Sequence, residues 1–413
     1  LGGNLHATIL GVWGFADHHG PDSEAGAPGW DVEVALFVGV GGGCVYVDGQ
    51  RLFQTHPLSY LTSWACTVRD PRGYHAASVR QGVVSYSGTV ALVWCHFGER
   101  PPAGPLELSL HAPSGGLALE AVPVCPWRPP GWPAYPQAAV AASAAGAPRP
   151  RSRPQHGAVS PYARGVTVCS EVLYGLDTAY RAGLVQQWLE YHRILGVDHF
   201  VLYDRDGSLG TSAVLEPYLL SGFVTYFPRF PEWALSPEHG LLHGVHGLPS
   251  HAAPDAQAAA HCLFSQRGLS EWVAFIHSPD EYLSSAGGLR DIRAEVLDQL
   301  RPLRAQGLGA VDVPALYFCR EPGEAMRESP WLLGRYVRRA TSPIELRRWG
   351  SGVAGFLNRF GSPLVDPRRV GDLVSAHYPR GQVGTLYLDD VPQSFLRVNH
   401  YGEAFAFRTV LEA

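Results

Sequence analysis

Two adjacent carboxylates, Asp280 and Glu281, follow a short apolar run at residues 272–276. The run is rich in aromatic and β-branched residues, which is typical of a buried strand, and Pro279 ends it because proline cannot donate to a sheet ladder. Ligands of open α/β sheets bind at the carboxyl ends of the strands. Carboxylates at such a point can hold a hard divalent cation and, through it, a phosphate. The alternative is a solvated acidic turn, and the strand context puts the two interpretations on an equal footing.

Further candidates lie at the end of another strand and late in the chain. Residues 199–203 form a strand-like run that ends at Tyr203 and Asp204, and in a doubly wound sheet this end and Asp280 could face one crevice. Asp204 is therefore a candidate nucleotide contact. His377 and His400 could return to the same crevice, and histidine together with carboxylate suits Mn²⁺. For each histidine taken alone, the alternative is a hydrogen-bonded structural residue.

Several common motifs are missing from the chain. We find neither GxGxxG after a strand nor GxxxxGK[ST], which argues against Rossmann and P-loop sites, and no GxSxG of an α/β-hydrolase. His243 and His246 lack the glutamate and the spacing of a zincin helix. A phosphate-bearing ligand without a glycine-rich loop needs another source of positive charge, and a metal ion on Asp280 would supply it.

The elements that must position these residues fall into three segments. Residues 1–125 carry short strands and turns, which predict a β-sandwich-like domain. Its tryptophans could line a sugar-stacking face, although such residues are more often core. Residues 126–164 are rich in proline and alanine and predict a linker. Residues 165–413 alternate strands with helices, which predicts a mostly parallel central sheet with helices on both faces.

Composition narrows the class of protein. The 413 residues are 46% hydrophobic and 17% charged, as in a globular protein of about two domains. The net charge of −5, with no broad basic field, argues against a nucleic-acid partner. The seven cysteines form no CxxC pair; four in the first third suit either disulfides in an oxidising lumen or buried thiols. No run is long enough for a transmembrane helix, so any membrane anchor would lie in a segment absent from this chain.

Several segments, taken in order, resemble glycosyltransferase family 92, which includes plant β-1,4-galactan synthases. Residues 188–192 (WLEYH), 195–200 (LGVDHF) and 202–204 (LYD) resemble its opening motif. The residues from Gln257 and Cys262 through Trp272 to Asp280-Glu281-Tyr282 resemble its Q…C…W…DxDE[FY] block. Asp366-Pro367, residues 374–377 and residues 399–401 resemble its closing segments. The resemblance covers about residues 166–407, and the N-terminal third resembles the β-rich region that precedes the catalytic domain in plant members.

This resemblance implies a GT-A fold, a UDP-sugar donor, an Mn²⁺ site and inversion at the anomeric carbon. Asp280 aligns with the second aspartate of DxD, which is the usual direct metal ligand, and Ser278 stands where the first aspartate is expected. Because a serine hydroxyl is a poor ligand for a hard cation, metal binding should weaken unless His277 compensates. Together with the candidates above, this gives a nucleotide-sugar site of Tyr203, Asp204, Ser278 and Asp280, a metal site of Asp280, His377 and His400, and supporting roles for His277 and Glu281.

The predicted function is transfer of a hexose, with galactose favoured, from a UDP-sugar to an acceptor hydroxyl with inversion. The acceptor would be galactan or a glycoprotein glycan, and the full-length protein would lie in the Golgi membrane with this domain in the lumen. A base must take the acceptor proton; none is identified, and Glu321 and Glu324 are only guesses. The alternative is a carbohydrate-binding protein with a degenerate, inactive transferase domain, for which Ser278 is the main support.

Overall fold

The computed structural model describes the strands of the N-terminal third and most of residues 163–319, followed by shorter stretches. Residues 127–162, most of the predicted linker, lie outside this description, as do His377, Glu321 and Glu324. The described residues are 5–15, 30–40, 65–70, 73, 75–77, 80–83, 90–97, 105–111, 118–126, 163–211, 213–230, 252–285, 291–319, 329, 331–335, 338–339, 362–370, 372–375, 378–380, 384–387 and 396–401.

The N-terminal third forms an eight-stranded sheet with the order β4-β3-β7-β8-β1-β2-β6-β5. Every pairing is antiparallel except that of β1 with β8. A disulfide joins Cys66 to Cys95, so β3 and β6, near opposite ends of the sheet order, approach each other. The β-rich character of this region is as predicted; the sandwich-like architecture stays a prediction. The strands are β1 (Leu5–Phe15), β2 (Trp30–Val40), β3 (Ala65–Arg69), β4 (His75–Ala77), β5 (Arg80–Val83), β6 (Val90–Phe97), β7 (Leu106–His111) and β8 (Ala118–Pro126).

A seven-stranded sheet with the order β11-β10-β9-β12-β17-β14-β20 forms the centre of the remaining chain. Strands β11, β10, β9 and β12 are parallel, whereas β17 runs antiparallel between β12 and β14. The sheet is therefore mixed, and the predicted mostly parallel sheet is confirmed in part. The chain runs outward from β9 to β11 and returns to β12, so the switch in strand order lies between β9 and β12. The strands are β9 (Arg164–Leu173), β10 (His199–Asp204), β11 (Val224–Pro228), β12 (Ser270–Ile276), β14 (Leu308–Val313), β17 (Ser362–Val365) and β20 (Gly384–Tyr387).

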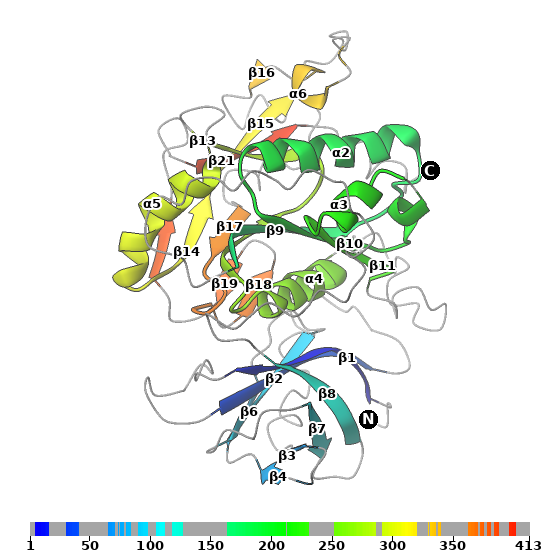
Figure 1. Ribbon diagram of the computed structural model, residues 1–413, viewed down its shortest axis with the longest axis vertical. Helices are drawn as coiled ribbons and strands as arrows, with labels where there is room; N and C mark the ends of the chain where they lie inside the picture. The colour runs from blue at the N-terminus through cyan, green and yellow to red at the C-terminus, as the bar shows by residue number, and fades with distance from the viewer. Residues whose placement is uncertain are drawn as a thin grey trace, which may run out of the picture.

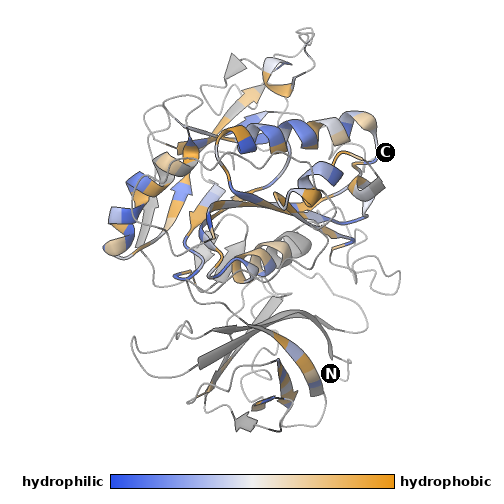
Figure 2. Cartoon of the chain, in the orientation of Figure 1, coloured by the Kyte–Doolittle hydropathy of each residue, from blue (hydrophilic) through white to orange (hydrophobic). Residues whose placement is uncertain are grey.

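Helices cover both faces of this sheet, as predicted. Helices α2 (Ala179–Ile194) and α3 (Glu216–Leu220) lie on one side of it, and α4 (Ala252–Ser265) lies on the other (Figure 1). Helix α4 also contacts β1, β2 and β6 of the N-terminal sheet, and α5 (Ile292–Ala305) packs beside β14. In Figure 2, α2 and α5 carry hydrophilic residues among hydrophobic ones, as expected of helices with one face in solvent.

Strand β12 shows why the central strands read as continuous apolar runs. Trp272 and Ile276 belong to the core on the α2 side, whereas Val273 and Phe275 belong to the core on the α4 side. Because both faces are covered, every position of the strand is buried and the usual alternation with polar residues disappears. A second disulfide, Cys169–Cys262, ties β9 to α4 within this core.

A smaller sheet with the order β13-β21-β15-β16 continues from the end of β12. In it, β13 is antiparallel to β21, and β15 is parallel to β21. No described helix is long and apolar enough to cross a membrane. The remaining elements are β13 (Glu281–Ser285), β15 (Ala315–Cys319), β16 (Arg338–Arg339), β18 (Asp372–Ser375), β19 (Tyr378–Arg380), β21 (Leu396–Tyr401), the 3₁₀ helix η3 (Ser208–Thr211) and α6 (Leu332–Arg335).

Candidate functional site

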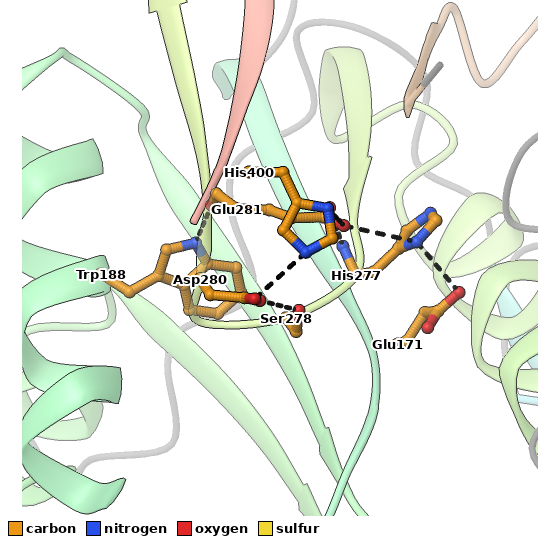
Figure 3. A network of polar contacts seen from close by, with 7 residues as sticks. All are labelled: Glu171, Trp188, His277, Ser278, Asp280, Glu281 and His400. Carbon is orange, nitrogen blue, oxygen red and sulfur yellow. Dashed lines mark hydrogen bonds and ion pairs between the residues drawn. The ribbon is translucent and has the colours of Figure 1, made fainter. Parts of the chain in front are cut away.

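Asp280 lies in the turn between β12 and β13 and is fully buried. Its Oδ1 accepts a hydrogen bond from the Ser278 hydroxyl, and its Oδ2 lies 3.1 Å from Nε2 of His400 (Figure 3). The backbone holds the same pair together, because the Tyr401 N–H donates to the Asp280 carbonyl at 2.8 Å. The structure thus brings together Ser278, Asp280 and His400, three of the residues that the sequence singled out.

Glu281 and His277 extend this cluster towards β9. The Glu281 carboxylate accepts from the His277 backbone N–H at 2.9 Å, and its Oε1 lies 3.7 Å from Nδ1 of both His277 and His400. Nδ1 of His277 also lies 3.5 Å from Oε1 of Glu171, near the end of β9 (Figure 3). Because β9 and β12 flank the switch in strand order, these side chains gather at the position where open α/β sheets bind ligands.

Helix α2 fixes the start of β13 through two side chains. The Trp188 indole N–H donates to the Glu281 carbonyl at 2.6 Å. His192 donates from Nδ1 to the Trp188 carbonyl at 2.8 Å, and its Nε2 accepts from the Leu283 N–H at 3.1 Å. The spacing of four residues puts Trp188 and His192 on one face of the helix. The WLEYH motif therefore acts on the site through the backbone that carries Asp280 and Glu281.

This arrangement predicts that the fold loses stability in mild acid. Burial lowers the pKa of His192 to about 4, and protonation of Nε2 would break its bond with Leu283. An unfolded histidine binds a proton below about pH 6.5. Stability is therefore complete above pH 6.5 and falls as the pH drops towards 4, by up to about 1.4 kcal/mol per pH unit for this residue.

Urea unfolding of the wild type and of His192→Phe between pH 4.5 and 7.5 measures this effect. The variant should be less stable at pH 7.5 and should show the shallower pH dependence. The control variant is His111→Gln, at an exposed histidine of β7. Equal slopes for His192→Phe and the wild type would contradict the assignment of a buried neutral His192.

Tyr203 and Asp204 end β10 at the same edge of the sheet, since β9, β10 and β12 are parallel. Asp204 accepts from the Gly207 and Leu209 N–H groups at 3.1 and 2.8 Å and from the Tyr226 hydroxyl at 2.6 Å. Burial raises its pKa to about 6. These bonds give Asp204 a structural role in shaping the loop after β10, and its contact with a nucleotide stays a prediction, as does that of the buried Tyr203.

Asp280 Oδ2 and His400 Nε2 are the two donors of this cluster that a divalent cation would use. Two neighbouring ligands of an octahedral ion at about 2.1 Å lie about 3.0 Å apart, and Asp280 Oδ2 and His400 Nε2 are 3.1 Å apart. Glu281 lies on the far side of the His400 ring, where a carboxylate orients a metal-binding histidine. The described residues contain no group of three or more such ligands. Phosphate oxygens of a substrate commonly complete sites of this kind.

Three contributors to the site were missed in the sequence. Glu171 is an isolated carboxylate inside an apolar strand, and that exception to the pattern is the signal that could have found it. The roles of Trp188 and His192 were not predicted, although both lie in a quoted motif. Asp366, which belongs to the closing segments named in the sequence analysis, lies at the opposite edge of the sheet because β17 is antiparallel. Its carboxylate binds Arg304 at 2.5 Å.

Comparison with known proteins gives a family match and a weak structural match. Residues 164–297, about a third of the chain, match the model of glycosyltransferase family 92. No curated protein matches the chain. Among solved structures, a crystal structure of mannosyl-3-phosphoglycerate synthase from Rubrobacter xylanophilus shares 16% sequence identity over 49% of this chain and 54% of that chain, about half of its length, with a TM-score of 0.23. So low a TM-score does not establish a shared fold.

The family match contains β9, α2, β12 and the turn with Asp280, and it ends inside α5. It confirms the resemblance to the family; the plant galactan synthase-like subtype stays a prediction. Residues 164–297 are therefore similar to glycosyltransferase family 92, the family that this comparison assigns to this part of the chain.

Proposed function

We propose that the chain transfers a hexose, with galactose favoured, from a UDP-sugar to a hydroxyl of a glycan acceptor with inversion at the anomeric carbon. One observation carries the proposal. Asp280 and His400 are 120 positions apart in the sequence, yet their side chains meet at the carboxyl edge of the sheet. Asp280 lies inside the segment that matches the family, and His400 lies outside it. A carboxylate and an imidazole at this edge suit a cation-assisted diphosphate site.

Asp280 and His400 would hold Mn²⁺, and His377 remains the predicted additional ligand. The bound ion would neutralise negative charge on the departing UDP. The hydroxyl of Ser278 takes a different part from the aspartate expected there, since it donates to Asp280 and fixes the orientation of that carboxylate. Oε1 of Glu281 lies 3.7 Å from Nδ1 of His400, on the other side of the ring. The cluster therefore supports a site in which serine orients the metal ligand.

Acceptor chemistry requires a base and a direct displacement. Inversion needs the acceptor hydroxyl to attack opposite the departing UDP while a side chain takes its proton. Glu171 and His277 lie at the switch in strand order, but their contacts with each other and with Glu281 mark them as groups that organise the site. We assign no base, and Glu321 and Glu324 stay candidates outside the described residues.

The cysteines support a proposal about the compartment. Four of the seven cysteines are paired in the described structure, as Cys66–Cys95 and Cys169–Cys262. Disulfides persist in oxidising compartments and are rare in the cytosol. They favour the lumenal side of the Golgi membrane over the cytosol for the full-length protein, with the anchor in a segment outside this chain.

Measurement of UDP release tests the proposed function. We expect turnover with UDP-galactose, Mn²⁺ and β-1,4-galactan oligosaccharides, loss of turnover with EDTA, and recovery when Mn²⁺ is added back. Calorimetric titration of UDP, with and without Mn²⁺, shows whether the donor site still binds the nucleotide or has lost this ability. Galactan binding without UDP binding would favour the alternative, a carbohydrate-binding protein whose transferase domain is inactive.

A further inference from the structure

Two aromatic side chains stand out on the surface near α2. Trp331 is 62% exposed and Tyr180 is 46% exposed. Within the described part of the chain, Trp331 is the one tryptophan among the exposed large apolar residues. A single exposed apolar residue needs no explanation, so the case depends on how these two side chains are held.

The turn that carries Trp331 is closed by contacts within itself. The Trp331 N–H donates to the Ser329 hydroxyl at 3.1 Å, and Nε of Arg335 donates to the Ser329 carbonyl at 2.8 Å. Gly334 packs so closely on Ser329 that a Cβ at this position would collide with its hydroxyl. These contacts therefore hold in place the backbone turn that carries the exposed indole.

The same turn is attached to α2. The Leu332 N–H donates to Oε1 of Gln187 at 2.9 Å. Nη1 of Arg335 donates to the Tyr180 hydroxyl at 2.6 Å, and the guanidinium carbon lies 5.2 Å from the Tyr180 ring centroid. Tyr180 and Gln187 are seven residues apart, so they share one face of the helix. Helix α2 therefore contacts both the turn that carries Trp331 and the backbone of Glu281 in the site.

Helix α2 also connects this surface to the turn that carries Asp280. Trp188, next to Gln187, binds the Glu281 carbonyl beside Asp280. At about 1.5 Å per residue, Tyr180 lies about 12 Å from Trp188 along the helix axis. A glycan chain of a few sugar units spans such a separation.

We propose that Trp331, Tyr180 and Arg335 form a stacking subsite for a hexopyranose unit of the acceptor glycan, a few sugars away from the point of transfer. The proposal rests on the proposed function. The C–H face of a pyranose ring packs on an aromatic ring, and a guanidinium donates hydrogen bonds to sugar hydroxyls. A protein partner is the weaker choice, because two partly exposed aromatic side chains supply less than the roughly 150–250 Å² each that full burial would give, and specific interfaces bury about 1,000 Å² or more.

Glycan binding without donor tests the subsite independently of transfer. Titration of the full chain with long and short β-1,4-galactan oligosaccharides should show binding of the long ones weakened about three- to tenfold in Trp331→Ala. Trp331→Phe should restore most of it. Leu220→Ala, at another exposed apolar residue, should bind as the wild type does. Light scattering on the same variants reports any change in oligomeric state.

Kinetics then place the subsite in the reaction. Trp331→Ala should raise KM for long acceptors by the same factor and leave KM for UDP-galactose and for short acceptors unchanged. Wild-type values for Trp331→Ala in both assays would overturn the proposal, and so would conversion of a dimer to a monomer by this substitution. If no UDP-sugar turns over while binding still depends on Trp331, the proposed function fails and the glycan subsite stands.

Discussion

Asp280→Asn should lower kcat/KM by about 10²–10³-fold, the range seen when one group that stabilises developing charge is removed. The substitution keeps the shape of the side chain and one oxygen for the Ser278 hydroxyl, but it removes the charge beside His400. The affinity for UDP should then no longer depend on Mn²⁺. Initial rates of UDP release and calorimetric titration of UDP with and without Mn²⁺ measure the two effects.

Asp366→Asn is the matched control for this experiment. Asp366 is also fully buried, and Arg304 and Arg369 lie 2.5 and 3.5 Å from its carboxylate at the opposite edge of the sheet. Its loss should reduce stability, because Arg304 loses its carboxylate partner, while kcat/KM of the folded enzyme stays at the wild-type value. An unchanged kcat/KM in Asp280→Asn would remove Asp280 from the donor site.

Trp188→Ala should lower the free energy of unfolding by about 3–5 kcal/mol, as expected for truncation of a buried tryptophan. The indole is fully buried, and its ring packs edge-on against Phe200 at 4.9 Å between centroids. The substitution also removes the donor to the Glu281 carbonyl. Urea unfolding measures the loss of stability, and titration of UDP in the presence of Mn²⁺ shows whether the site loosens with it.

Two conservative variants separate packing from hydrogen bonding. Trp188→Phe and Trp272→Phe both shrink a buried ring, but Nε1 of Trp272 has no hydrogen-bond partner in the described structure. Trp188→Phe should therefore cost about 1–3 kcal/mol more than Trp272→Phe, since it leaves a buried carbonyl unsatisfied. Equal costs would show that the bond from Trp188 to Glu281 contributes nothing to stability.

The sequence predicted the parts of the site that lie at the ends of strands. The apolar run before Asp280 is buried on both faces, so composition alone revealed a core strand, and the proline marked its end. The antiparallel β17 was not foreseen, because four buried residues carry no sign of direction. Its insertion between β12 and β14 sends Asp366 away from the site.

The remaining parts depend on contacts that no local pattern encodes. His400 meets Asp280 because β21 pairs with β13 in a particular register, in which Glu281 lies opposite His400. The sequence pattern placed His400 among the candidates, but the strand register that brings its side chain next to Asp280 is a property of the folded sheet. Trp188 and His192 stood out in the sequence as parts of the WLEYH motif, and their bonds to Glu281 and Leu283 show what they hold.

The pairing of β13 with β21 has a consequence for biosynthesis. A ribosome delivers Asp280 well before His400, so the hydrogen-bonded pair can form only once β21 is available to pair with β13. Until then, Asp280 lacks the imidazole that lies beside it in the folded chain. Under the proposed function, a nascent chain therefore gains its cation site only after β21 has been synthesised.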